Sequence, residues 1–241
     1  MIAIYKREMR AFFTSPSGYI YIAMFVAVSA FFFSMFTLLA GADSKITTYF
    51  TAELFIAALM TPLLTMKSFS EERKQKTEQL LMTAPITLPG MVLGKFLASY
   101  SMFGIAFLIT CLNYPIALNY LSEANLFQYN AVCALGGAVA LFLVGGTFIA
   151  IGVFISSLTE NQIVSGSVTI VVLAVLLLVS FANSYIGFAP LRAFFSWLSI
   201  YTRFTNFSSG YFDIAALLYY ISIMGVCVFL TVRVYEKKRW A

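Results

Sequence analysis

Long apolar runs separated by short polar stretches dominate the chain. Six of them reach or approach the roughly 20 helical residues that cross a hydrocarbon layer about 30 Å thick. They cover residues 19–41, 49–66, 90–120, 126–158, 163–181 and 214–232. The pattern predicts an all-α membrane protein with six transmembrane helices in a single transmembrane domain.

The segment that precedes the first run has a different pattern. In residues 1–18, Ile2, Tyr5 and Met9 recur at helical spacing, and Lys6 lies on another face. This indicates a helix that lies in the membrane interface, although an unstructured basic flank would contain the same charges. We expect Pro16 to break this helix. No small-residue cleavage site follows the first run, so we expect a retained membrane helix and not a signal peptide.

Composition excludes a soluble globule. The 241 residues are 61% hydrophobic and 10% charged, with a mean hydropathy of +0.90, whereas soluble domains average about 45–50% apolar and about 25% charged residues. The chain has no histidine, and its three cysteines show no CxxC spacing, so metal, haem and redox sites lack ligands. The sequence also contains no P-loop. We therefore expect no catalytic site and no cofactor in this chain.

Lysine and arginine predict the orientation in the membrane. Placing the N-terminus inside collects twelve of the fifteen basic residues on the cytoplasmic side and leaves only Lys45, Arg192 and Arg203 outside. The expected location is the cytoplasmic (inner) membrane of a bacterium, with both termini cytoplasmic. Because the positive charges are divided among three membrane-flanking segments, we do not expect nucleic acid as a partner.

Ionisable residues are nearly absent from the runs. Glu53 and Lys95 lie near run ends, and we expect the central two-thirds of each helix to contain no charged side chain. This disfavours a proton-coupled secondary transporter. The case for a sodium-coupled transporter is also weaker, but it is not excluded, because hydroxyl and carbonyl oxygens can bind sodium. Pro62 and Pro115 are candidate helix breaks.

The fourth run is rich in glycine and contains small-xxx-small pairs, Gly136/Ala140, Gly146/Ala150 and Gly152/Ser156. Such spacing allows helices to approach closely. The pairs are compatible with a dimer interface and equally with packing inside one subunit.

The cytoplasmic segment 68–85 is the most informative stretch. Ser70 is placed to cap a helix from Glu71 to Met82, and Glu72 stands four residues before Lys76, in the favourable orientation for an ion pair. The front of this helix is charged and its end is apolar. A solvated connector would explain the charges, but the apolar end between two spans favours protein docking.

The external segment 182–213 contains too many aromatic residues for a solvated linker. We expect short re-entrant helices that dip into the outer interface and form a cap. The candidates for an external gate are Trp197, Tyr201, Phe204 and Phe207. Interfacial anchoring without gating is the alternative.

Several stretches are similar to one family. Glu72, Thr77 to Leu81, Thr83 and Pro85 resemble the coupling-helix loop of ABC-2-type transporter permeases, although Lys76 stands where a glycine often precedes the threonine. Tyr5 to Glu8 with Phe13 to Tyr19, Ser157 to Gln162 and Arg203 to Gly210 resemble the branch that includes gliding-motility and nitrous-oxide-reductase-maturation permeases. The resemblance covers the full chain.

The resemblance implies a permease subunit that moves or extrudes a substrate across the membrane. It implies as partners a separate ABC ATP-binding subunit, which binds ATP and Mg²⁺, and a second copy or a sister permease. Two further partners are expected: an accessory membrane protein that has an external domain, and membrane lipid. The residues that would dock the ATPase are Glu71, Glu72, Thr77, Glu78, Leu80 and Leu81. The alternative function is a non-transporting membrane scaffold that couples an ABC ATPase to an envelope machine.

Overall fold

Every regular element that the structure describes is a helix. The computed structural model describes residues 1–39, 46–76, 87–120, 127–182, 195, 197 and 199–240. The helices in chain order are α1 (Ile2–Thr14), α2 (Pro16–Phe33), the π-helical turn η1 (Ser34–Leu38), α3 (Ile46–Thr65), α4 (Ser70–Lys74), α6 (Leu88–Thr110), α7 (Asn113–Tyr120), α8 (Phe127–Leu158), α9 (Gln162–Ala182), α11 (Ile200–Ser208) and α12 (Ile214–Trp240).

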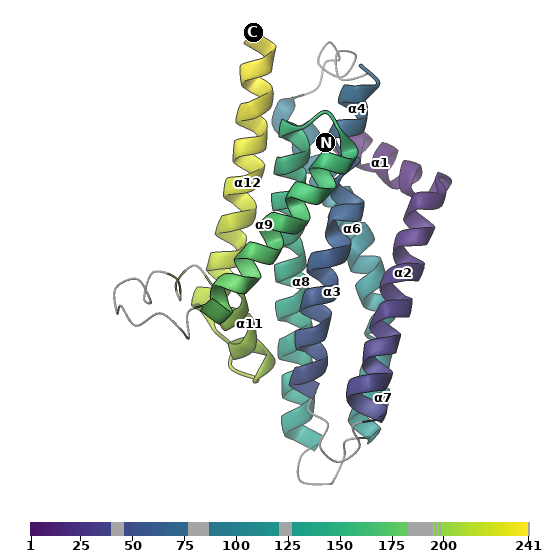
Figure 1. Ribbon diagram of the computed structural model, residues 1–241, viewed down its shortest axis with the longest axis vertical. Coiled ribbons are helices and arrows are strands. Elements are labelled where there is room, and N and C mark those ends of the chain that lie inside the picture. The colour runs from purple at the N-terminus through teal and green to yellow at the C-terminus, as the bar shows by residue number, and fades with distance from the viewer. Residues whose placement is uncertain are drawn as a thin grey trace.

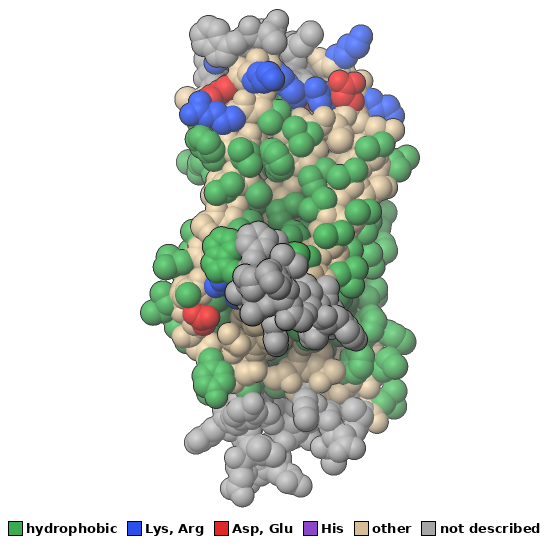
Figure 2. Space-filling model, turned by 60° about the vertical axis from the view of Figure 1, so that its left-hand side comes forward, with side chains coloured by type: hydrophobic (Ala, Val, Ile, Leu, Met, Phe, Trp, Pro, Cys, Tyr) green, Lys and Arg blue, Asp and Glu red, His purple; other side chains and the backbone are tan. Residues whose placement is uncertain are grey.

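Six helical segments in this part of the chain are long and apolar enough to cross a membrane, which confirms the predicted fold class. The segments that contain α2, α3, α6, α8, α9 and α12 form an elongated bundle, and α1 lies across one end of it (Figure 1). Both chain termini lie toward that same end. Lys, Arg, Asp and Glu side chains gather there, above a surface of mainly hydrophobic side chains (Figure 2).

Helix α8 is the centre of the bundle. It contacts α3, α6, α9, α11 and α12, and most of its span is buried, whereas the spans of α2, α9 and α12 are largely exposed. Exposed apolar side chains such as Val171 and Leu178 on α9 suit contact with lipid.

The glycines of α8 allow neighbouring helices to approach closely. A Cβ at Gly152 would lie 2.3 Å from Oγ1 and 2.8 Å from Cβ of Thr65 on α3, and one at Gly136 would lie 2.3 Å from the Phe207 carbonyl oxygen on α11. A Cβ at Gly146 would lie 2.6 Å from the Met224 sulfur on α12. The small-xxx-small pairs of this run therefore serve packing inside the subunit.

Several helix boundaries differ from the sequence prediction, and two of the differences involve prolines. The first span begins at Pro16, because the proline occupies the first turn of α2, where its missing N–H is not needed. The expected span 90–120 is divided at Cys111, where α6 ends, and α7 begins at Asn113. Pro115 has no N–H to donate to the Cys111 carbonyl, which accepts instead from Tyr114 N at 3.1 Å. Pro62, in contrast, lies inside α3 without ending it.

Two glycine-to-alanine substitutions are expected to have opposite effects. Gly152→Ala adds a methyl group that collides with Thr65 and should reduce the free energy of unfolding by about 1–3 kcal/mol. The methyl group of Gly225→Ala on α12 meets no atom of the described residues within 4 Å, so this substitution should stabilise its helix by about 0.5–1 kcal/mol. Thermal unfolding of both variants in detergent checks this pair, and equal shifts would contradict the packing of α8 against α3.

Candidate functional site

The segment that follows α3 is fixed to α8 by backbone hydrogen bonds. Phe69 N and Ser70 N donate to Ser156 Oγ at 3.1 and 3.2 Å. Ser70 was expected to cap the next helix, but it is the first residue of α4, and its hydroxyl donates to the Met66 carbonyl. The helix cap is Phe69, whose side chain is buried. The small Ser156 thus holds the start of the loop at the end of α8.

Lys95 of α6 lies at the centre of a charged cluster beside this loop. Its side chain is only 1% exposed, yet its Nζ lies 2.9 Å from Glu72 Oε1, 3.2 Å from Glu8 Oε1 and 2.6 Å from the Ser68 carbonyl oxygen. The ammonium also lies 4.9 Å from the centre of the Phe69 ring. A buried charge is tolerated only when paired and hydrogen-bonded, and here α1 and the loop supply its partners.

Arg7 extends the cluster on α1. Its guanidinium lies 2.6 Å from Glu8 Oε1 and 2.7 Å from Glu72 Oε1. Partial burial acts to lower the pKa of Arg7, but the carboxylates of Glu8 and Glu72 outweigh this effect, so its pKa is raised. We call Arg7, Glu8, Glu72 and Lys95 the Lys95 cluster. It joins α1, the loop helix α4 and the spanning helix α6.

Further contacts fix α4 to the ends of three spans. Arg73 donates to the Leu158 carbonyl oxygen at 3.2 Å and lies 3.7 Å from Glu160, which precedes α9. From α12, the Tyr235 ring packs on Phe69 with centroids 4.9 Å apart, and Lys238 donates to the Ser157 carbonyl oxygen at 3.2 Å. Helix α4 and its cap Phe69 thus contact the end of α8, the residues before α9, and α12.

The described helix is shorter than expected. It ends at Lys74, and Lys76 has a φ of +57°, the left-handed conformation that favours glycine. Because Lys76 lies outside the helix, the expected Glu72–Lys76 pair is replaced by the pairing of Glu72 with Lys95 and Arg7. Glu71 is on α4, whereas Thr77, Glu78, Leu80 and Leu81 lie outside the described residues.

The four candidate gate residues do not share one environment. Phe204 and Phe207 of α11 are fully buried, Tyr201 is half-buried, and Trp197 is 62% exposed. Ser199 caps α11 by accepting from Thr202 N at 3.1 Å.

Arg203 of α11 holds Trp197 and α12 together. Its guanidinium lies over the Tyr219 ring at 4.3 Å and donates to the Trp197 carbonyl oxygen at 3.3 Å. The residues 183–194, 196 and 198 of the expected cap lie outside the described part of the chain.

A buried carboxyl group corrects the expectation of charge-free helix centres. Glu53 lies well inside α3 and is fully buried. Its Oε1 accepts from Tyr49 Oη at 2.6 Å and from the Ser29 hydroxyl of α2, and its Oε2 has no hydrogen-bond partner in the part of the chain that the structure describes. Hydroxyl donors from two helices make this polar group tolerable in a membrane span. Sequence reasoning missed it because Ser29 is remote in sequence and looks like an ordinary small residue in an apolar run.

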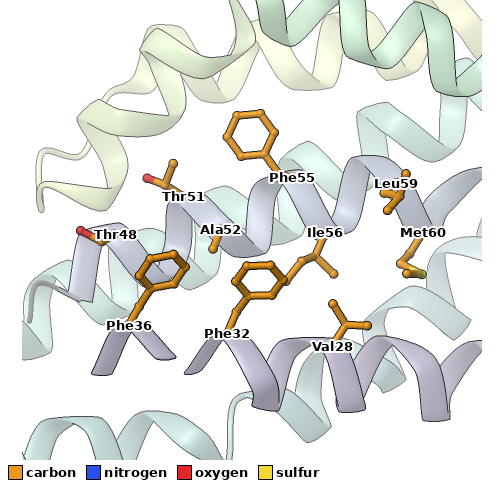
Figure 3. A pocket seen from close by; sticks show the side chains of 10 residues that line it. All are labelled: Val28, Phe32, Phe36, Thr48, Thr51, Ala52, Phe55, Ile56, Leu59 and Met60. Atoms are coloured by element: carbon orange, nitrogen blue, oxygen red, sulfur yellow. The ribbon is translucent and has the colours of Figure 1, made fainter. Parts of the chain in front are cut away.

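On the other side of the same two helices lies an apolar groove of about 400 Å³. Phe32 and Phe36 lie opposite Ala52 and Ile56 of α3 (Figure 3). Thr48 and Thr51 are its polar members.

The fold and this site define a multi-pass helical membrane protein with a loop joined to several spans at one end. The chain belongs to the ABC-2 family of transporter proteins, whose family model matches residues 2–235. It is thus an ABC transporter permease, a membrane subunit that works with an ATP-binding subunit. No curated protein matched the chain in a sequence search.

Removing the central cation of the Lys95 cluster is expected to loosen the loop. Lys95→Met leaves Glu8 and Glu72 without their buried partner, which should cost about 2 kcal/mol of unfolding free energy. Lys6→Met, an exposed position on α1, is the matched control and should change stability by less than about 0.5 kcal/mol. Thermal unfolding in detergent measures both, and equal stability of the two variants would contradict the structural role of Lys95.

Glu53 permits a second comparison. Glu53→Ala leaves the Tyr49 and Ser29 hydroxyls without their acceptor and should cost about 1–3 kcal/mol. Glu53→Gln keeps an acceptor oxygen and should cost less. The rate of proteolysis in detergent ranks the stability of the two variants. If the Gln variant were cleaved as fast as the Ala variant, the hydrogen bonds to Oε1 would not be what stabilises this region.

Proposed function

We propose that this permease transmits ATP-driven movement from a cytoplasmic ATPase through α4 and the Lys95 cluster to its spans. The observation that supports this most directly is the position of Lys95, which bonds to α1 and to the loop while it belongs to α6. A force on the loop would reach α1 and α6 through ion pairs and α8 through Ser156. In this proposal the end with both chain termini is the cytoplasmic end, in the inner membrane of a bacterium.

The docking surface would combine α4 with the residues that follow it. Glu71 is half-exposed on α4 and remains available to a basic partner, whereas Glu72 is mainly engaged inside the subunit. Leu80 and Leu81 would supply the apolar contacts and Thr77 and Glu78 the polar ones. The partner would bind ATP and Mg²⁺, and its closure would shift the permease between two states.

A second permease, either a copy of this chain or a sister subunit, would complete the transport path. The largely exposed spans α2 and α9 leave apolar surface for such a partner or for lipid. The substrate would pass between the two subunits, and the groove between α2 and α3 favours an amphipathic cargo. Export or extraction suits this surface better than uptake of a small polar solute. Trp197, Tyr201, Phe204 and Phe207 would act at the external exit.

The resemblance to gliding-motility and nitrous-oxide-reductase-maturation permeases supports the second candidate function. In it the same coupling elements anchor an ATPase that works on an envelope machine through an accessory membrane protein, without transport. Reconstitution in liposomes with the ATPase and candidate substrates distinguishes the two functions. A transporter shows substrate-dependent flux and ATPase stimulation, and a scaffold shows neither.

Docking and transmission are expected to be separable by mutation. Leu80→Ala with Leu81→Ala should weaken ATPase binding about thirtyfold, since truncation of a buried contact residue costs ~2 kcal/mol or more. Lys95→Met should retain the ATPase but reduce the coupling of ATP hydrolysis to the permease, because it alters only the internal connection. Co-purification and ATPase assays of both variants test this.

Lys6→Met serves again as the control that should bind and couple normally. Full ATPase binding and coupling in the double leucine variant would reject the docking role. Aggregation of that variant without the ATPase would show that these leucines mainly stabilise the permease itself.

A further inference from the structure

A second groove lies between α6 and α12, near the end of the bundle that bears the charged side chains. It encloses about 310 Å³, within the range of small-molecule sites. Its apolar walls are Pro89 and Leu93 from α6 and Gly225, Val228, Phe229 and Val232 from α12. These residues belong to two candidate membrane spans, so the groove opens toward the acyl chains of the bilayer.

Gly225 leaves one wall of this groove open. Among the described residues, no atom lies within 4 Å of the position that a Cβ would occupy at this exposed glycine, so the absent side chain leaves open space beside the helix. Arg233 follows eight residues later, about 12 Å along the helix axis. This length matches the upper part of an acyl chain whose headgroup lies beside Arg233.

Charged side chains are restricted to one end of the groove. The apolar part of α12 ends at Val232, and Arg233 and Glu236 form the rim. Arg233 is 61% exposed, lies 4.9 Å from the centre of the Phe229 ring and pairs with Glu236 Oε2 at 2.6 Å. Lys237 and Arg239 are also exposed in the same tail. Arg233 and Glu236 balance each other at the rim, and the basic excess comes from the neighbouring residues at this end of α12.

We propose that this groove is a binding site for one anionic phospholipid. In this proposal an acyl chain lies between the apolar walls as far as Gly225. The phosphate binds the Arg233 guanidinium, where it either replaces the Glu236 carboxylate or shares the guanidinium with it. Arginine is suited to this role because its planar donors match phosphate oxygens, and the start of α6 adds the positive end of a helix dipole. A neutral lipid would fill the same walls but would gain less from the basic rim.

The test uses the full-length permease, delipidated in detergent and titrated with phosphatidylglycerol or with phosphatidylcholine of the same acyl chains. Native mass spectrometry counts the bound lipid. We expect one phosphatidylglycerol to bind at least tenfold more tightly than phosphatidylcholine. Arg233→Ala should weaken phosphatidylglycerol binding about tenfold and weaken phosphatidylcholine binding less, because the phosphate of phosphatidylcholine is neutralised by its own choline group. Glu236→Gln should strengthen phosphatidylglycerol binding, an effect opposite in sign.

Filling the groove tests the acyl-chain site independently. Gly225→Leu should weaken the binding of both lipids, whereas Val226→Leu, at the neighbouring exposed position outside the groove walls, should change neither. Melting temperatures in detergent show that each variant is folded. Equal affinity for the two lipids, or unchanged binding in Gly225→Leu, would overturn the proposal. A change of oligomeric state in Gly225→Leu would also overturn it, because a second copy would then be the occupant.

Discussion

Close packing around α8 is the constraint on which the rest of the structure depends. Inside a membrane, apolar surfaces gain little from leaving lipid for one another, so helices associate through close contact and hydrogen bonds. The glycines of α8 provide this contact by letting Thr65 and the Phe207 carbonyl approach its backbone. With α8 fixed, its final turn presents Ser156 to the loop after α3, and its first third presents Gly136 to α11. One helix thus positions structures at both ends of the bundle.

Buried polar side chains occur where other groups of the protein supply their hydrogen bonds or opposite charges. Lys95 and Glu53 are the two main cases, and their surroundings differ. Lys95 is nearly inaccessible but lies at the charged end of the bundle, where Glu8, Glu72 and a carbonyl oxygen neutralise and solvate its ammonium. Glu53 lies inside the span, where hydroxyl groups replace water as hydrogen-bond donors. In both cases the polar group adds a hydrogen-bonded link between helices that also pack on each other, α1 with α6 and α2 with α3.

Much of this fold was predictable from the sequence, because each spanning helix is a local property of an apolar run of sufficient length. The charged front of the loop was also visible, since Glu71 and Glu72 follow directly after a span. Tertiary partners were not visible. Glu72 pairs with Lys95 and Arg7 instead of Lys76, because Lys76 takes a left-handed conformation and leaves the helix. The hydrogen bonds of Glu53 depend on Ser29, 24 residues earlier, and no periodicity in either run indicates that pairing.

The arrangement of these polar links bears on how a permease of this kind would move. Ion pairs at the charged end can exchange partners, since Glu72 faces both Lys95 and Arg7. Such an exchange leaves the total charge of the cluster unchanged. The contacts of α8 with Thr65 and Phe207 are steric and do not stretch without loss of packing. Movement would therefore occur as the displacement of α1 relative to a rigid group of α3, α8 and α11, to which α4 is joined through Ser156. A smaller share of α2 than of α3 is buried, so α2 is the span that would move most easily together with α1. The apolar groove between α2 and α3 would then change shape.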